Sequence, residues 1–95
     1  MVIIGKGKLD EFSQKHADAR KQIESWTALV EAAEWANPMD VREHFPMADF
    51  LGDGKCVFNI KGNHYRLYVK IAFKTKKVLV KEAGTHAEYD KWDLS

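Results

Sequence analysis

The feature that most constrains the fold is a two-residue alternation that begins at Lys55. Apolar residues recur at every second position in three successive segments, CVFNI (56–60), YRLYVKIAF (65–73) and VLVKEA (78–83). This period is typical of β-strands that bury one face. The segments are joined by KGNH and KTKK, connections of the length that hairpins use. We therefore predict an antiparallel meander of three strands.

The middle segment predicts two unlike sheet faces. One face carries the apolar residues at odd numbers from 65 to 73, which must pack on the rest of the domain. The other face carries Arg66, Tyr68 and Lys70. Residues 55–81 hold eight Lys or Arg and no acidic residue, although the net charge of the whole chain is only +1. A basic sheet face with an interleaved aromatic ring is typical of a surface that binds the backbone of RNA or DNA.

Other interpretations of this basic face stay open. Lysine-rich strands can simply be solvated. The same face could also bind DNA or an acidic protein partner without any catalysis.

Helical spacing and capping residues predict what covers the apolar face. A short strand at 2–4 precedes a helix from Leu9 and a second helix from an N-cap at Asp18 to about Trp35. Asn37, followed by proline, caps a short third helical turn. The predicted fold class is α+β in the order β-α-α-β-β-β. The N-terminal strand and two helices pack on one face of a small antiparallel sheet, and the basic open face lies opposite.

The length of 95 residues predicts a single domain, 1–95. No apolar run is long enough to cross a bilayer, and the N-terminus lacks the apolar stretch and cleavage site of a secretory signal. Cys56 is the single cysteine, so it has no partner for a disulfide or a paired-thiolate metal site. We expect a cytoplasmic protein with no membrane segment.

A polar stretch, GTHAEYD, follows the last predicted strand. Thr85 and Glu88 have the spacing of a capping box, which places His86, Tyr89 and Asp90 on one short helical turn. A histidine can act as a general acid or base near neutral pH, and a tyrosine can donate a proton or stack on a nucleobase. The turn could equally be a polar cap that holds the C-terminus against the sheet.

The basic strands could supply the phosphate contacts that such chemistry needs. Arg66 has the fork geometry that suits phosphate oxygens, and Lys61, Lys70 and Lys81 can stabilise charge that develops in a transition state. Asn59 is expected on the same open face. Together these are the parts for metal-independent cleavage of RNA by its own 2′-hydroxyl. No HExxH motif, cysteine pair or glycine-rich phosphate loop indicates a metal or another cofactor.

Several stretches of the chain are together specific to one family. The run VFNIKGNHYRLYVKIAF followed by GTHAEYD resembles the HigB-type toxins of bacterial type II toxin–antitoxin modules, as do the opening MVIIGKGKLDEFSQKHADARKQIESW and the middle FPMADF. The resemblance covers essentially the whole chain. It implies a RelE-like fold, in which two N-terminal helices cover one face of an antiparallel sheet and a concave basic active site lies on the other.

The resemblance also implies an activity and partners. Toxins of this kind are mRNA endonucleases that arrest translation, usually by cutting codons on the ribosome. A cognate helix-turn-helix antitoxin of the HigA type neutralises them, and operator DNA is expected to be bound only through that antitoxin. The family's usual reaction is attack of the ribose 2′-oxygen on the adjacent phosphate, which gives a 2′,3′-cyclic phosphate and a 5′-hydroxyl.

Residue-by-residue matching to the family implies the roles. Arg66 of YRL looks like the phosphate-binding arginine of RelE-like sites, His86 like the acid or charge stabiliser, and Tyr89 like the tyrosine that stacks on a base. Asn59 stands where some relatives have a catalytic lysine, and this departure leaves the general base unassigned. The predicted catalytic residues are His86, Arg66, Tyr89 and Lys61. The predicted RNA-binding residues are Asn59, Asn63, Tyr68, Lys70 and Lys81.

Two functions besides RNA cleavage stay open at this point. The protein could block translation as a non-catalytic RNA- or ribosome-binding module. It could also be an inactive toxin that serves only as an antitoxin-bound corepressor.

Overall fold

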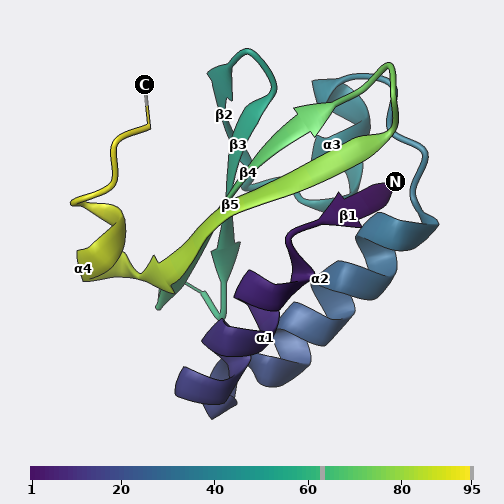
Figure 1. The fold of residues 1–95 in the computed structure, drawn as a ribbon. Helices are drawn as coiled ribbons and strands as arrows, with labels where there is room; N and C mark the ends of the chain where they lie inside the picture. The colour runs from purple at the N-terminus through teal and green to yellow at the C-terminus, as the bar shows by residue number, and fades with distance from the viewer. Residues whose placement is uncertain (63, 95) are drawn as a thin grey trace.

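The computed structural model describes residues 1–62 and 64–94 and has an α+β architecture (Figure 1). In chain order the elements are β1 (Val2–Ile4), α1 (Lys6–Lys15), the 3-10 turn η1 (Ala17–Ala19), α2 (Arg20–Ala32), α3 (Pro38–His44), β2 (Asp49–Gly52), β3 (Lys55–Ile60), β4 (Tyr65–Ala72), β5 (Lys77–Thr85) and α4 (His86–Tyr89). The strands of the described residues form one five-stranded sheet in the order β1-β5-β4-β3-β2. Figure 1 shows α1 and α2 side by side and α4 at the far end of β5.

The predicted meander is confirmed, but the sheet as a whole is not antiparallel. β3 pairs with β4 and β4 with β5, both antiparallel, and their register aligns Asn59, Arg66 and Gly84 in one row. β1 pairs with β5 in parallel, which makes the sheet mixed and corrects the prediction. Hydrophobic periodicity identifies a strand but carries no information about the direction of a partner far along the chain.

One strand was missed from the sequence. β2 pairs antiparallel with β3 and forms the edge of the sheet. Only Phe50 among its four residues is half-buried, and the others are exposed. The segment therefore lacks the alternation that marks a strand, and short edge strands of this kind are easily mistaken for loops.

Gly5 turns the chain directly from β1 into α1. Its φ is +97°, and a Cβ at this position would lie 3.1 Å from the carbonyl oxygen of Val80. Glycine alone combines this left-handed conformation with so close an approach. As a result α1 begins at Lys6, before the predicted start at Leu9, and Gly7 lies inside the helix.

The predicted N-cap of the second helix is wrong. α2 begins at Arg20 and has no side-chain cap. The carboxylate of Asp18 instead accepts hydrogen bonds from the hydroxyl of Tyr65 at 2.6 Å and from Nζ of Lys61 at 2.9 Å. The carboxylate that local spacing predicted as a helix cap thus binds residues that are distant in sequence.

The other helix boundaries follow local rules more closely. The side chain of Asn37 accepts a hydrogen bond from the amide of Asp40 at 3.1 Å, and Pro38 occupies the first turn, as predicted for α3. α2 ends at Ala32, before the predicted end at Trp35. None of the described helices is both long and apolar enough to cross a membrane.

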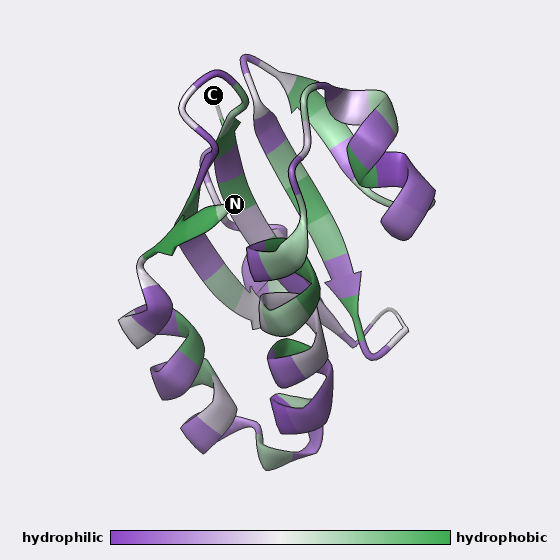
Figure 2. Ribbon diagram, turned by 90° about the vertical axis from the view of Figure 1, so that its right-hand side faces the viewer, coloured by the Kyte–Doolittle hydropathy of each residue, from purple (hydrophilic) through white to green (hydrophobic). Residues whose placement is uncertain are grey.

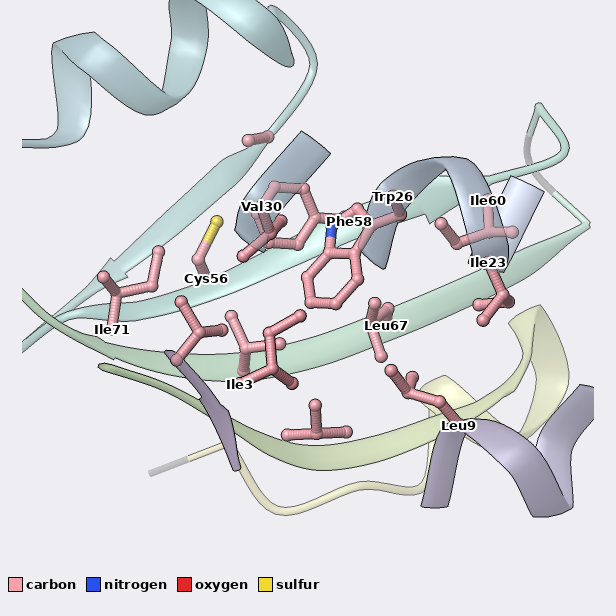
Figure 3. Close-up of a cluster of buried hydrophobic side chains, with 14 of the residues drawn as sticks. Ile3, Leu9, Ile23, Trp26, Val30, Cys56, Phe58, Ile60, Leu67 and Ile71 are labelled. Atoms are coloured by element: carbon pink, nitrogen blue, oxygen red, sulfur yellow. The ribbon is translucent and has the colours of Figure 1, made fainter. Parts of the chain in front are cut away.

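The core lies between the sheet and helices α1 and α2. Trp26, Phe58 and Leu67, from α2, β3 and β4, are almost completely buried. Figure 3 shows them in one cluster with Ile3 and Leu9, and Figure 2 shows hydrophobic and hydrophilic residues alternating along the central strands. The apolar face predicted for the middle strand is therefore the face that packs on the helices.

Candidate active site

A capping box stabilises the start of the short helix α4, as predicted. The amide of Glu88 donates to Oγ1 of Thr85 at 3.2 Å, and the amide of Thr85 donates to Oε1 of Glu88 at 2.9 Å. The bond from the Thr85 backbone to the charged carboxylate lowers the pKa of Glu88 below its usual range. Local sequence alone thus fixes where the strand ends and the helix begins.

A backbone hydrogen bond joins the loop between β3 and β4 to the first residue of α4. The amide of His86 donates to the carbonyl oxygen of His64 at 3.2 Å. The β4–β5 register, which pairs Tyr65 with Thr85, brings these two segments together. Sequence reasoning missed His64 as a neighbour of the site, although this antiparallel register was the signal that could have identified it.

Three of the predicted catalytic side chains lie together at this end of the sheet. The guanidinium carbon of Arg66 is 5.5 Å from the ring centroid of Tyr89, and the rings of Tyr89 and His86 are 6.3 Å apart. Arg66 is half-buried and His86 is exposed. A guanidinium stacked on an aromatic ring keeps its N–H groups in a fixed plane for phosphate oxygens. We call Arg66, Tyr89 and His86, whose catalytic role is proposed below, the catalytic cluster.

The C-terminal tail packs back on the cluster through Trp92. The rings of Tyr89 and Trp92 meet edge to face at 5.7 Å. A Cβ on Gly84 would lie 2.9 Å from the indole, so only glycine leaves room for it here. Gly84 lies inside β5 and does not end the strand. The sequence predicts that Trp92 anchors the short tail after Asp90, and the contacts of its ring with Tyr89 and Gly84 agree with that prediction. The role of Gly84 in leaving room for the indole was not predicted.

The other predicted residues near the cluster differ in their neighbours. Asn59 is exposed and lies beside Arg66 in the strand register. Asp90 is exposed at the end of α4, where its amide donates to the carbonyl oxygen of His86 at 3.3 Å. Asn63, predicted to bind RNA, lies outside the described residues.

Lys61 is not brought to the catalytic cluster. Its ammonium pairs with Asp18 at 2.9 Å, and the same carboxylate binds the hydroxyl of Tyr65. The side chain of Tyr65 belongs to the helix side of the sheet, whereas Arg66 points to the open face. The arrangement therefore supports a structural tie for Lys61 and gives no support to its predicted catalytic role.

Tyr68 is not the open stacking surface that the alternation predicted. It is on the expected face, but only 5% of it is exposed. Its partner in the β3–β4 register is Val57, which is also buried. Tyr68 lines a hollow together with Lys70, Lys81 and other residues. Alternation assigns a residue to a face but cannot reveal that neighbouring side chains cover it.

The described residues contain no group of three or more His, Cys, Asp or Glu side chains placed to hold a metal ion. The chemistry available at the cluster is that of an imidazole, a phenol and a guanidinium. These groups can transfer protons, stack on a base and stabilise a phosphate anion.

Comparison with known proteins identifies the family. Residues 19–92 match the HigB toxin family, the RelE-like toxic component of a toxin–antitoxin system. The chain is 31% identical over 93 residues to an mRNA interferase HigB of Escherichia coli O6:H1, with 96% of this chain and 90% of the relative covered. It is 25% identical to the mRNA interferase toxin HigB of Escherichia coli K12, with 95% and 88% covered, and equally so to an mRNA interferase HigB of Shigella flexneri. The chain therefore belongs to the HigB family of RelE-like toxins.

Proposed function

We propose that this toxin is an endoribonuclease that cleaves mRNA and thereby inhibits translation and growth. The observation that carries the proposal is the catalytic cluster at the end of the open sheet face. It combines a cationic fork for phosphate oxygens, an aromatic ring for a base and a titratable imidazole. The names of the relatives, mRNA interferases, support the same activity.

In the proposed reaction the ribose 2′-oxygen attacks the adjacent phosphorus, and the bond between phosphorus and the 5′-oxygen breaks. The products are a 2′,3′-cyclic phosphate and a 5′-hydroxyl. Arg66 holds the non-bridging oxygens and stabilises the negative charge of the transition state. His86, as an imidazolium, donates its proton to the leaving 5′-oxygen. Tyr89 orients the base next to the scissile bond by stacking.

The 2′-hydroxyl must also lose its proton, and we assign that proton to His64. The bond between the His86 amide and the His64 carbonyl joins the backbones of these two residues. It brings the exposed side chain of His64 to this end of the sheet, where its ring lies 6.3 Å from that of Tyr65. Asn59, beside Arg66 in the register, would bind the RNA through its amide. The proposed route uses no metal ion and no cofactor.

Induced expression of variants in a bacterial host tests the site. Arg66→Ala and His86→Ala should each slow mRNA cleavage by about 10²–10⁴-fold and relieve growth arrest. Arg42→Ala is the matched control, because Arg42 makes the same kind of contact with Phe50, at 5.4 Å, outside the cluster. Unchanged toxicity and cleavage in both site variants would refute the assignment.

The same cultures separate cleavage from the other functions. Intact mRNA together with stalled ribosomes would indicate a module that acts by occupancy. Normal growth on expression of the wild-type protein would indicate an inactive toxin retained as a corepressor.

The partners follow from the family and from the chemistry. The family implies an antitoxin as partner. We propose that it is a helix-turn-helix protein of the HigA type, that operator DNA is bound only through it, and that cleavage takes place on ribosome-bound mRNA in the cytoplasm. Purified toxin that cut free mRNA as fast as mRNA in translating ribosomes would contradict the ribosome dependence.

A further inference from the structure

We infer that a lysine-lined hollow on the open face is a second RNA-phosphate site, and that Asp93 of the C-terminal tail occupies it in the free protein. The inference rests on the proposed function, because it assigns the hollow to the same RNA strand. The hollow measures about 530 Å³ and is distinct from the catalytic cluster. Four lysines line it: Lys8, Lys55, Lys70 and Lys81.

The strand register concentrates positive charge in the hollow. Lys55 on β3 and Lys70 on β4 are direct register partners, and like charges placed directly opposite each other destabilise a sheet. Lys81 lies at an irregularity, since Tyr68 pairs with Glu82 and the next residue of β4 pairs with Val80. Such a bulge re-aims the side chain of the unpaired residue. A bound phosphate would offset the repulsion that these positions create.

Helix α1 contributes the fourth lysine. Nζ of Lys8 donates to the carbonyl oxygen of Lys81 at 2.8 Å, which holds this side chain at the rim of the hollow. The bond uses one of the three protons of the ammonium, so the others can be donated to an anion. The hollow thus recruits a cation from a different layer of the fold.

Asp93 places a carboxylate of the chain's own among these lysines. It lines the hollow together with Asp53 and Glu82, but those two belong to the β2–β3 turn and to β5. Asp93 follows Trp92, whose ring contacts the ring of Tyr89 in the catalytic cluster. Asp93 therefore lines the hollow from a segment that follows α4 and lies outside the strands of the sheet.

The hollow and the cluster are separated along one strand. Arg66 and Lys70 share a face of β4 four positions apart, which corresponds to about 13 Å. A single RNA strand that touches both must contact them through different phosphates. The hollow therefore adds affinity for RNA that extends beyond the scissile bond, and RNA that enters it displaces Asp93.

Binding of a short single-stranded DNA oligonucleotide, which lacks the attacking 2′-hydroxyl, tests the site at several salt concentrations. Lys70→Gln should weaken binding and reduce the slope of log K against log salt by about 0.7, the value for one lost phosphate contact on a single strand. Arg20→Gln is the matched control, because Arg20 is exposed on α2 and lines a hollow between α1 and α2 that contains none of the predicted RNA-binding residues, and its slope should equal that of the wild type.

Asp93→Asn should bind the same oligonucleotide about two- to five-fold more tightly at low salt, and the gain should vanish at high salt. Asp10→Asn, an exposed position on α1, makes the same change in net charge and should leave the affinity unchanged. Equal effects of Lys70→Gln and Arg20→Gln, or of Asp93→Asn and Asp10→Asn, would overturn the inference.

Wild-type protein that failed to bind the oligonucleotide even at low salt would also overturn it. Cleavage of mRNA by that protein would leave the proposed function standing. Conversely, Lys70→Gln should reduce the salt slope by the same amount in a His86→Ala background as in the wild type, so loss of cleavage and loss of the second site are measured separately.

Discussion

Replacing Gly84 by alanine adds one methyl group where the C-terminal tail crosses β5. The added Cβ would lie 2.9 Å from the indole of Trp92 and 3.0 Å from Oε1 of Glu88. Carbon atoms pack best at about 3.5–4.0 Å. Either the indole or the capping carboxylate must therefore move, and Tyr89, which contacts Trp92, is expected to move with it.

The expected change in the free energy of unfolding combines two opposing effects. Overpacking costs about 1–3 kcal/mol, and alanine restricts the unfolded chain, which offsets about 0.4–1 kcal/mol. We expect a net loss of about 1–2 kcal/mol in the free energy of unfolding. RNA cleavage should fall further than stability, because Tyr89 is the residue that stacks against Arg66.

Urea unfolding and mRNA cleavage, measured on the same preparations, check both expectations. Gly7→Ala is the matched control. Gly7 lies inside α1, and a Cβ at this position would have no neighbour within 4 Å. Because alanine favours the helix over glycine, this substitution should stabilise the protein by up to about 1 kcal/mol. Trp92→Leu should relieve the clash, so Gly84→Ala should cost less in that background. Equal costs of Gly84→Ala with and without Trp92, or full activity of the single variant, would refute this account of the tail.

The remaining predictions concern stability and reactivity. The hydrogen bond from Tyr65 lowers the pKa of Asp18 from 3.8 to about 2. Because the pKa is lower in the folded state, the stability that this carboxylate contributes is present above pH 4 and is lost as the pH falls toward 2. Asp18→Asn should remove this part of the acid dependence of the urea midpoint, and an unchanged profile would contradict it. Burial raises the pKa of Cys56 to about 12, so a thiol reagent at pH 8 should modify it only as fast as the protein opens; rapid modification of native protein would contradict its burial. Thr85→Ala should cost about 0.5–2 kcal/mol through loss of the α4 cap, and urea unfolding that matched wild type would show that the cap contributes nothing.

The proximity of Arg66, Tyr89 and His86 could be predicted largely because local rules and strand register govern it. Alternation assigned Arg66 to the open face, and the capping box placed His86 and Tyr89 on one turn beyond β5. The resemblance to HigB toxins then supplied their roles, which spacing alone left open between catalysis and a polar cap. The mutual approach of these side chains follows from the meander that the sequence predicts.

The errors at the candidate site involve contacts between residues far apart in the chain. Lys61 was predicted to be catalytic, but its ammonium pairs with Asp18 at the turn between α1 and α2. Tyr68 is on the predicted face but is covered. The close approach of Trp92 to Gly84 was not predicted, although Trp92 was expected to anchor the tail. The parallel pairing of β1 was missed for the same reason, since periodicity describes one segment at a time.

The most direct test of the central claim is the chemistry of the RNA ends that purified toxin produces. Wild-type protein and Arg42→Ala should yield fragments with 5′-hydroxyl and 2′,3′-cyclic phosphate ends. Arg66→Ala and His86→Ala should yield about 10²–10⁴-fold fewer in the same time. Fragments with 5′-phosphate ends, or equal yields from all four proteins, would contradict cleavage by the Arg66–Tyr89–His86 cluster.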